Sequence, residues 1–377
     1  MLRDQKMTTA SFDSRWSLLY RIRCAFAILQ SLHVNYLPER VPTPAATEDK
    51  VDLLVAIVAW RCAELTMDCL RSIAADTLRV PMRVIVVDNA SGDGTAERLQ
   101  SAIAQHDWAG WAQLLRAPSN GGFASGNNVA IRAALAQQPA LKYVLLLNPD
   151  TVVRPEAFRI LIDFMEAHPE VGVAGGRSED PDTTPQFCCF RFPTLPSELA
   201  SYLRLGLVDR LLGRWATRIG IPEQPTQVDW VSGAHMIIRR EVIDAIGLMD
   251  EGYFLYYEET DFTLRARRAG WDCWHVPQSR IVHLVGQSSG VTLRDGKPRR
   301  LPKYWFESRR RYFILNHGRL YAALTDLIVL AAFGVWRLRR VLQRKPDSDP
   351  PCFIRDLLRH GAILNGRGSL RPRAVDL

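Results

Sequence analysis

The sequence predicts an α/β protein whose centre is a doubly wound, mostly parallel β-sheet with helices on both faces. Nearly continuous apolar runs rich in valine and leucine are typical of parallel strands buried on both faces, and they occur at residues 51–60, 83–88 and 142–147. Segments with apolar residues at helical spacing separate these runs, as in βαβ units. Polar turn residues follow each run. Because ligands bind beyond the carboxyl ends of such strands, we expect the functional site there.

The first half of the predicted sheet is built from strictly alternating strands and helices. VDLLVAIVAW is followed by a helical pattern, and RVIVVD then forms a second strand that ends in Asp and Asn. A glycine-rich turn later leads into a helix, and a fourth strand ends at Asn148. The expected elements are strands at 51–60, 83–88, 111–118 and 142–147 and helices at 64–76, 94–106 and 120–138.

The second half carries weaker patterns. Pro155 marks the start of a helix over 155–169 that covers one face of the sheet. The stretch from Val171 to about Thr226 is interpreted as a variable insertion with an apolar VGVAGG segment and one helix near 198–212. The remaining expected elements are a strand turning into a helix within 230–247, a helix over 260–270 and a strand at 274–286, with Gly247 and Gly270 ending the two helices.

Both ends of the chain are expected to add helical regions to the central domain. Residues 1–50 hold an amphipathic pattern without a clean signal peptide, and then a proline-containing linker; a membrane role and packing on the central domain both stay open. Within the C-terminal region, 320–336 is slightly short for a spanning helix and contains Asp326. This favours an interfacial or re-entrant helix, with a plain packed helix as the alternative. The predicted divisions are an N-terminal helical extension with its linker (1–50), the central domain (51–290) and the C-terminal region (291–377). The central domain divides into two halves, 51–152 and 153–290.

The charge of the chain is unevenly distributed. Lys and Arg number 48 against 40 Asp and Glu, for a net charge of +8, and much of the excess follows residue 290. Anionic lipid headgroups or a phosphorylated substrate suit such a skew, whereas no nucleic-acid-binding module is present, so nucleic acid is not an expected partner. The 7 cysteines form no CxxC pair, which argues against a zinc site or a disulfide framework and favours a reducing cytoplasm.

Two segments at strand ends have groups suited to a nucleotide. Asp88 follows a buried strand and can accept hydrogen bonds from a base or ribose, although an Asx turn explains it equally well. The turn NGGFASGNN offers backbone N–H groups at the start of a helix, where a pyrophosphate would be stabilised. It matches neither a Walker loop nor the dinucleotide fingerprint. The candidate residues of this turn are Asn120, Gly121, Gly122 and Asn128.

Two further segments supply carboxylates. Asp150 follows the apolar strand YVLLL and can hold Mg²⁺ or Mn²⁺, with a simple turn as the alternative. YYEETD crowds three acids together, which raises some of their pKa values, and one of them could act as a general base. If a helix begins here with Thr260 as its cap, its dipole favours an acid at Asp261. That alternative does not account for Glu258 and Glu259, which precede the cap. His283 is a metal or phosphate ligand or a structural histidine.

The order of these blocks resembles family 2 glycosyltransferases of the GT-A fold, an αβα sandwich, and in particular their rhamnosyltransferase-like branch. The resemblance covers roughly residues 51–290. It rests on the blocks VIVVDNASGDGT, NGGFASGNN, LLLNPDT, VSGAHMIIRREVIDAIGLMDEGYFLYYEETDFTLRARRAGW and HLVGQS. It implies an inverting transfer in one displacement, from a nucleotide sugar to a hydroxyl, assisted by a divalent metal.

The resemblance assigns roles to single residues. Asp88 contacts the nucleobase, with Ala59 and Trp60 beside it. Asp150 is the last acid of the metal motif, in which Asn148 replaces the usual first acid, and His283 matches a histidine that approaches the metal. The base falls on Glu259, where the family more often has Asp, so Glu258 and Asp261 remain alternatives. The acceptor pocket is expected at Trp230, Ser232 and Gly233.

The implied function is sugar transfer in cell-surface polysaccharide synthesis. The donor would be dTDP-rhamnose or a UDP-sugar, and the acceptor a glycan or lipid-linked oligosaccharide. The enzyme would be cytoplasmic and peripheral on the inner face of the cell membrane. Two alternatives are a catalytically weak membrane-associated scaffold and a sugar-nucleotide pyrophosphorylase, but AWRCAELT replaces the glycine-rich, basic loop that the latter needs after its first strand.

Overall fold

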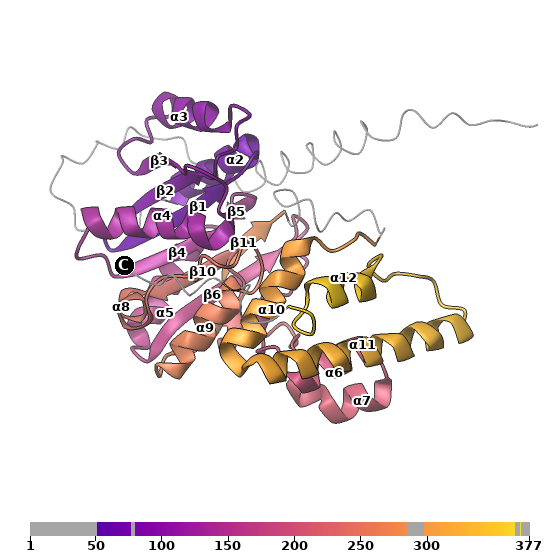
Figure 1. Cartoon of the computed structure of the whole chain (residues 1–377). Coiled ribbons are helices and arrows are strands. Elements are labelled where there is room, and N and C mark those ends of the chain that lie inside the picture. The colour runs from indigo at the N-terminus through magenta and orange to yellow at the C-terminus, as the bar shows by residue number, and fades with distance from the viewer. Residues whose placement is uncertain (1–50, 77–79, 285–297, 366–369, 371–377) are drawn as a thin grey trace, which may run out of the picture.

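The computed structural model describes residues 51–76, 80–284, 298–365 and 370. The helix expected before residue 50 and the proposed boundary at residue 290 lie outside these residues. Figure 1 shows an αβα body with a group of C-terminal helices, coloured orange to yellow, packed at one end. The main sheet has the strand order β3-β2-β1-β4-β10-β6-β11-β5, with β8 paired to β11.

The first half of this sheet is parallel, as predicted. β1 pairs in parallel with both β2 and β4, and β2 pairs in parallel with β3. The bounds are β1 (Leu53–Ala59), α2 (Ala63–Asp76), β2 (Met82–Asp88), α3 (Thr95–Gln105), β3 (Ala112–Arg116), α4 (Gly122–Gln137) and β4 (Tyr143–Leu147). All seven elements expected in this half are therefore confirmed, each within a few residues.

The continuous apolar character of the strands follows from burial on both sides. Leu53, Val55 and Ile57 of β1 belong to one hydrophobic cluster, and Leu54 and Ala56 belong to the other. α2, α3 and α5 cover the first face, while α4, α8 and α9 cover the second. Since every side chain of such a strand is buried, the usual alternation of polar and apolar residues is lost.

The second half is more regular than the sequence indicates. Its elements are β5 (Thr151–Val153), α5 (Ala157–Ala167), β6 (Val171–Glu179), β7 (Cys189–Phe190), α6 (Leu195–Leu203), α7 (Gly206–Leu212), β8 (Thr226–Val228), β9 (Trp230–Val231), β10 (His235–Arg239), α8 (Arg240–Ile246), α9 (Glu258–Arg268) and β11 (Asp272–His283). β10 runs antiparallel to β4 and β6, so the sheet is mixed.

Three expectations for this half need correction. β6 is a long strand inside the main sheet, in the stretch interpreted as an insertion. The single helix expected near 198–212 is two helices, because Arg204 adopts a left-handed conformation with φ 49° between them. The helix expected at 260–270 starts earlier, at Glu258, so Thr260 lies within its first turn and does not cap it.

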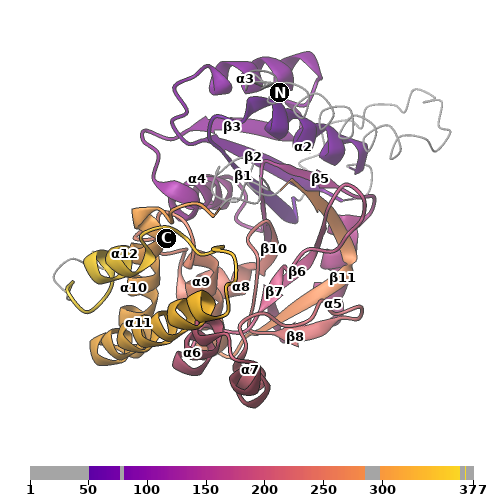
Figure 2. The same cartoon turned by 90° about the vertical axis from the view of Figure 1, so that its right-hand side faces the viewer.

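The C-terminal region folds into three helices: α10 (Lys303–His317), α11 (Arg319–Leu342) and α12 (Phe353–His360). α11 packs on α6 and α10, in agreement with the packed-helix alternative, although by length and composition it could also cross a membrane. Arg309 of α10 is buried between α6 and α11, where its Nη2 lies 2.6 Å from Glu198 Oε2 and its Nη1 binds Asp326. Figure 2 shows these helices from the side.

Candidate active site

The carboxyl ends of β1 and β2 form one wall of the site. The backbone N–H of Asn89 donates to the Ala59 carbonyl at 2.8 Å, which joins the two strand ends. Asp88 Oδ2 accepts from the Ser91 N–H at 3.3 Å, so the Asx turn is present. Its Oδ1 is buried and has no hydrogen-bond partner among the described residues. A buried oxygen of this kind is suited to accept a hydrogen bond from a ligand.

Arg61 is a cation at this wall that the sequence interpretation missed. It follows Trp60, whose ring is 39% exposed, and its guanidinium carbon lies 5.0 Å from the centroid of that ring. Its backbone N–H and its Nε donate to Ser91 at 2.9 and 3.1 Å. The sequence signal that could have identified Arg61 is a basic residue directly after the first buried strand.

The glycines of the glycine-rich turn pack against the protein itself. Gly122 has φ +84°, and a Cβ on it would lie 1.8 Å from the carbonyl oxygen of Phe254. The same carbonyl accepts from the Phe123 N–H at 2.9 Å. A Cβ on Gly126 would lie 2.6 Å from the side chain of Val58. Close backbone packing therefore accounts for these glycines without a phosphate, and nucleotide binding by Gly121 and Gly122 stays a prediction.

The two asparagines of this turn differ in their surroundings. Asn120 Oδ1 accepts from Asn89 Nδ2 at 3.0 Å and from the Gly122 N–H at 3.1 Å, so it lies beside the end of β2. Asn128 is buried, exchanges hydrogen bonds with the backbone of Met249 and donates to Glu251 at 3.0 Å. The amide of Asn128 is thus occupied inside the fold. Both partners are distant in the sequence, and nucleotide binding by Asn128 stays a prediction.

The ends of β4 and β11 bring the candidate metal ligands together. His283 pairs with Thr151 in the register of β11 and β5, and the Leu284 N–H donates to the Asp150 carbonyl at 2.9 Å. As a result, His283 Nε2 lies 3.5 Å from Asp150 Oδ1 and 3.2 Å from Asn148 Nδ2. Asp150 and His283 are two residues of these types, and the described parts of the chain hold no group of three or more His, Cys, Asp or Glu residues that could bind a metal ion, this site included.

Glu258 and Glu259 open α9 at the other side of the site. Tyr256 and Tyr257 just before them have φ of 71° and 69°, a left-handed conformation that turns the chain sharply into the helix. Burial raises the pKa of Glu258 well above its usual value, and the neighbouring charge of Glu259 raises it further. Burial also raises the pKa of Glu259, while hydrogen bonds from its own backbone and that of Gly233 oppose the increase. Oε2 of each has no hydrogen-bond partner among the described residues.

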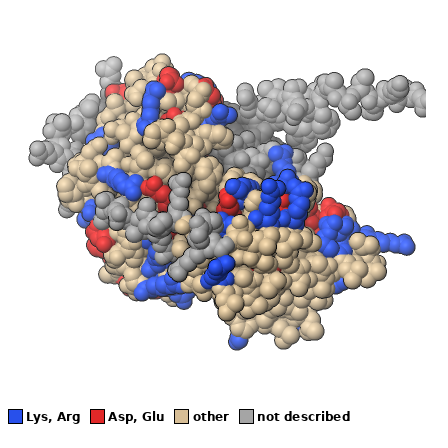
Figure 3. Space-filling view, viewed as in Figure 1, with Lys and Arg blue, Asp and Glu red and all other residues tan. Residues whose placement is uncertain are grey.

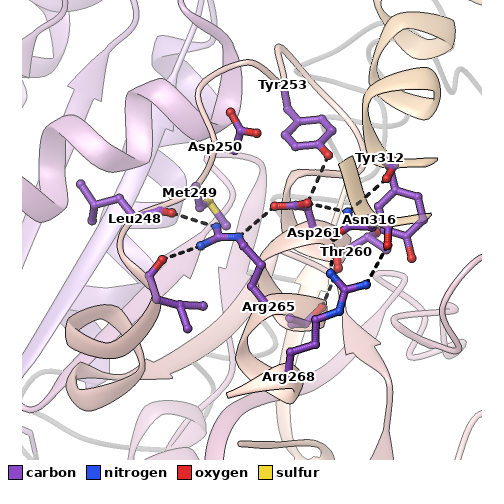
Figure 4. A network of polar contacts seen from close by, with 12 residues as sticks. Leu248, Met249, Asp250, Tyr253, Thr260, Asp261, Arg265, Arg268, Tyr312 and Asn316 are labelled. Atoms are coloured by element: carbon purple, nitrogen blue, oxygen red, sulfur yellow. Dashed lines mark hydrogen bonds and ion pairs between the residues drawn. The ribbon is translucent and has the colours of Figure 1, made fainter. Parts of the chain in front are cut away.

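Asp261 lies one turn along the same helix but belongs to a different group of contacts, which Figure 4 shows. It is fully buried, and its oxygens accept from Arg265 at 3.0 Å, from Asn316 at 2.7 Å and from the Tyr253 hydroxyl at 3.3 Å. Its negative charge is therefore balanced inside the protein. This surrounding favours a structural part for Asp261 and leaves Glu258 and Glu259 as candidate bases.

The segment 230–235 links the candidate base to the candidate metal ligands. The Asn148 N–H donates to the Ala234 carbonyl at 3.1 Å, and a Cβ on Gly233 would lie 2.9 Å from the ring of Phe123 and 4.0 Å from Glu259 Oε1. Ser232 donates its N–H to the Cys188 carbonyl at 2.9 Å. Gly233 thus keeps the space beside Glu259 open.

Trp230 lies at the outer end of this segment. Its ring stacks on Phe190 with centroids 4.3 Å apart, and its Nε1 donates to the Arg191 carbonyl at 3.0 Å. This stacking fixes the orientation of the Trp230 ring at the outer end of the segment. Acceptor binding by Trp230, Ser232 and Gly233 stays a prediction.

Comparison with known proteins identifies the relatives of this fold. A family model described as glycosyltransferase like family 2 matches residues 51–309. The N-acetylglucosaminyl-diphospho-decaprenol L-rhamnosyltransferase of Mycobacterium tuberculosis is 29% identical over 227 residues, which cover 56% of this chain and 69% of that protein. The rhamnosyltransferase WbbL of Escherichia coli is 26% identical over 169 residues, covering 43% of this chain and 60% of the relative.

Among solved structures, GalNAc-T7 with UDP, GalNAc and Mn²⁺ is similar, with a TM-score of 0.52 and 15% sequence identity. The match covers 88% of this chain and 60% of the other. At this level of identity the likeness concerns the fold alone. It confirms the predicted αβα architecture.

Proposed function

The chain belongs to the family 2 glycosyltransferases, and from this premise we propose that it is an inverting enzyme that moves a sugar from a nucleoside diphosphate to a hydroxyl group. The observation that carries the proposal is the convergence at one edge of the sheet. The partnerless Asp88 Oδ1 and the Asp150–His283 pair lie at the ends of neighbouring strands. Glu259 lies beside Gly233, and the next residue, Ala234, accepts a hydrogen bond from the Asn148 N–H. This is the set of groups that a nucleotide, a divalent cation and an acceptor hydroxyl would require.

The donor we propose is dTDP-rhamnose, followed by UDP-sugars. Support comes from the names of the relatives, since the Mycobacterium tuberculosis and Escherichia coli proteins are named as rhamnosyltransferases. A further relative, at 21% identity, is the dTDP-rhamnosyl transferase RfbF of Shigella flexneri. We place the nucleobase beside Asp88 and Trp60, where a buried acceptor oxygen and an exposed aromatic face lie together.

A divalent cation, Mg²⁺ or Mn²⁺, fits the oxygen and nitrogen donors at the ends of β4 and β11. Asp150 would supply a carboxylate, His283 its Nε2, and Asn148 its amide oxygen, which a rotation of the amide would bring to the same side. When bound, the cation would offset the negative charge that develops on the departing diphosphate. With only one carboxylate among these three residues, the diphosphate itself would complete the coordination.

Glu259 is the base in this proposal. Its carboxylate accepts the proton of the acceptor hydroxyl while that oxygen forms a bond to the anomeric carbon, and the bond from this carbon to the diphosphate oxygen breaks with its electron pair. One displacement inverts the anomeric centre. Gly233 leaves room for the acceptor beside Glu259, because any side chain there would approach Phe123 and the carboxylate.

Glu258 influences this step by remaining uncharged. Burial keeps its pKa well above the usual value, so it remains protonated at a pH at which Glu259 is ionised. A neutral neighbour keeps the two carboxyl groups from repelling each other. Glu258 is therefore a positioning residue in this proposal.

We further propose that the enzyme works on the cytoplasmic face of the membrane, on a glycan or lipid-linked acceptor. The relative from Mycobacterium tuberculosis is named for a decaprenol-linked diphospho-sugar acceptor. This chain has a basic C-terminal region and an apolar helix, α11, and both suit an enzyme whose acceptor is held at a membrane. The alternative is a scaffold without catalysis, and nucleotide binding distinguishes it from a transferase.

Thermal unfolding with a panel of nucleoside diphosphates and nucleotide sugars, with and without Mn²⁺, tests the donor site. We expect one nucleotide to stabilise the wild type in the presence of Mn²⁺, and Asp150→Ala to lose this stabilisation because the cation loses its carboxylate. The exposed Asp163 of α5 is the matched control, so Asp163→Ala should keep it. If no nucleotide raises the melting temperature of the wild type, the transferase proposal is wrong and the scaffold is favoured.

A further inference from the structure

α11 carries an exposed apolar stripe along its whole length. Its members are between 45% and 85% exposed, and they are Leu320, Leu324, Leu327, Val335, Leu338, Val341 and Leu342. Most of them follow one another at spacings of three or four residues, or multiples of these, so they lie along one side of the helix. A helix of 24 residues is about 36 Å long at about 1.5 Å per residue. An apolar stripe of this length is unusual on the surface of a soluble protein.

α7 extends the apolar surface beside the C-terminal half of α11. Leu207 and Leu211 are 70% and 68% exposed. The two helices are close, because Arg339 of α11 donates to the carbonyl of Leu203, just before α7, at 3.0 Å. Figure 3 shows a wide surface without charge over the position of these helices, at the lower right, with Lys and Arg along its margins. We call the exposed leucines and valines of α7 and α11 the α7–α11 surface.

The opposite side of α11 is held firmly by the fold. Ala322, Val329 and Phe333 are buried on that side. Asp326 is also buried there, where it binds Arg309 of α10 and accepts from the Ala362 N–H at 2.5 Å. To cross a bilayer, α11 would have to leave these partners and carry a carboxylate into hydrocarbon. The geometry therefore favours a helix that lies flat with only its outer side in contact with lipid.

Cations stand at both ends of the surface. Arg319 begins α11, and Arg344 and Lys345 follow its end, all of them exposed. Arg210 and Arg214 lie in and just after α7 and are exposed as well. Two copies packed through antiparallel α11 helices would bring the cationic ends together, which costs free energy. An anionic lipid surface, in contrast, attracts both ends.

We propose that the α7–α11 surface binds the interface of an anionic bilayer, with the axis of α11 parallel to the membrane plane. The leucines enter the boundary between headgroups and acyl chains, and the arginines contact lipid phosphates. The inference rests on the proposed function for its purpose, because it would hold the active site near a lipid-linked acceptor. The inference identifies the α7–α11 surface as the face that binds the membrane, and the proposed function alone does not specify that face.

Flotation of the full chain with vesicles tests the proposal. We expect the wild type to float with phosphatidylcholine vesicles containing phosphatidylglycerol, and much less with pure phosphatidylcholine. Leu327→Glu/Leu338→Glu should reduce binding by about 100-fold, because each buried leucine contributes about 10-fold or more to partitioning. Equal flotation of this variant and the wild type would overturn the proposal.

The matched control adds the same two charges at the other end of the molecule. Gln100 and Gln105 of α3 are exposed, and Gln100→Glu/Gln105→Glu should float as the wild type does. Stabilisation by nucleotide is measured on every variant. A variant that keeps its stabilisation by nucleotide but no longer floats identifies the membrane face. If no protein, the wild type included, is stabilised by nucleotide, that result contradicts the proposed function and leaves the membrane inference untouched.

Two measurements distinguish other uses of the same surface. Sedimentation without lipid shows whether the wild type is a dimer that Leu327→Glu/Leu338→Glu separates; a dimer of this kind without flotation would show a self-association surface and overturn the proposal. Washing cell membranes with alkaline carbonate should release the protein, since a helix that lies flat is extractable. Retention after this wash would mean that α11 spans the bilayer.

Discussion

At the scale of single residues, the two neighbouring acids of α9 differ from ordinary surface carboxylates. Glu258 is 2% exposed, and its Oε2 has no hydrogen-bond partner among the described residues. An ionised carboxylate in such a place costs free energy, and the cost appears as a raised pKa. This has consequences both for stability and for the pH dependence of catalysis.

We predict that Glu258→Gln stabilises the protein at pH 8. A carboxyl whose pKa is raised in the folded state binds more protons in the folded than in the unfolded protein. Its contribution to the free energy of unfolding is therefore fully present below about pH 4.3 and is lost as the pH rises through the pKa of the folded state. Each unit of the raised pKa corresponds to about 1.4 kcal/mol. Urea unfolding between pH 4.5 and 8 should show a flatter dependence for Glu258→Gln, whereas Glu223→Gln, at an exposed site, should match the wild type.

The same variant tests the assignment of the base. In this proposal Glu258 is still neutral when Glu259 ionises, and burial raises the pKa of Glu259 without a contribution from the charge of Glu258, so Glu258→Gln should leave the acid limb of the pH profile of kcat in place. Glu259→Gln should abolish turnover. If Glu258→Gln abolishes turnover instead and Glu259→Gln does not, the roles of the two residues are exchanged.

Most of the candidate site residues could be proposed from the sequence because they stand at the ends of strands or at the start of a helix. Asp88, Asp150 and Glu259 each stand next to a local pattern that marks a strand end or a helix start. The surroundings of Asn128 could not be predicted, because its partner Met249 is distant in the sequence and no local pattern reveals that contact. The packing of the glycines in the turn could not be predicted for the same reason, since the crowding by Phe254 arises only in the folded chain.

At the scale of elements, α10 holds the loop that precedes the candidate base. Arg311 of α10 makes two hydrogen bonds to Asp250, at 2.9 and 2.8 Å, and both side chains are buried. Ser308 donates to the Leu255 carbonyl at 3.0 Å. A Cβ on Gly252 would lie 2.2 Å from the guanidinium of Arg311, so the loop lies directly against it. α10 therefore sets the direction in which α9 begins.

We predict that Arg311→Met lowers the free energy of unfolding by about 3–5 kcal/mol, because Asp250 would remain buried without its cation. The loop before Glu259 would also loosen, so kcat should fall more than the KM for the nucleotide sugar rises. Lys303→Met, on an exposed part of the same helix, is the control. Wild-type kcat in folded Arg311→Met would contradict the positioning role, and partial recovery in Arg311→Lys would support it.

The elements that the sequence missed are those defined by pairing between distant segments. β6 lies between β10 and β11, and two of its three glycines, Gly175 and Gly176, leave room for Val231 and His235. A strand with several glycines has little local propensity, so only its neighbours show that it belongs to the main sheet. β1, β2 and β4, in contrast, are apolar throughout, and were predicted from that alone.

At the scale of the whole molecule, a buried ion network ties the C-terminal helices to the catalytic body. Arg309 is 1% exposed and binds Glu198 of α6 and Asp326 of α11. Because α11 carries the α7–α11 surface and α10 holds the loop at the base, this network connects the proposed membrane face to the active site. We therefore expect the C-terminal region to be needed by the working enzyme.

We predict that Arg309→Met lowers the free energy of unfolding by about 3–5 kcal/mol, since two buried carboxylates would lose their cation. Arg309→Met/Glu198→Gln/Asp326→Asn should recover more than half of this loss, because its buried groups are neutral. Urea unfolding measures both, and Arg159→Met, which breaks an exposed ion pair with Asp163 on α5, should cost less than about 1 kcal/mol. A triple variant as unstable as the single one would show that charge is not the cause.

The contact between Gly122 and Phe254 has a consequence for how related sequences are compared. A side chain at residue 122 would displace the backbone at Phe254, only a few residues before the candidate base. We therefore expect natural selection to retain glycine at this place in homologues, whichever sugar they transfer and whichever nucleotide they use. An invariant glycine here would record crowding between two parts of the main chain. Alignments that score it as a mark of phosphate recognition would overestimate what it says about the donor.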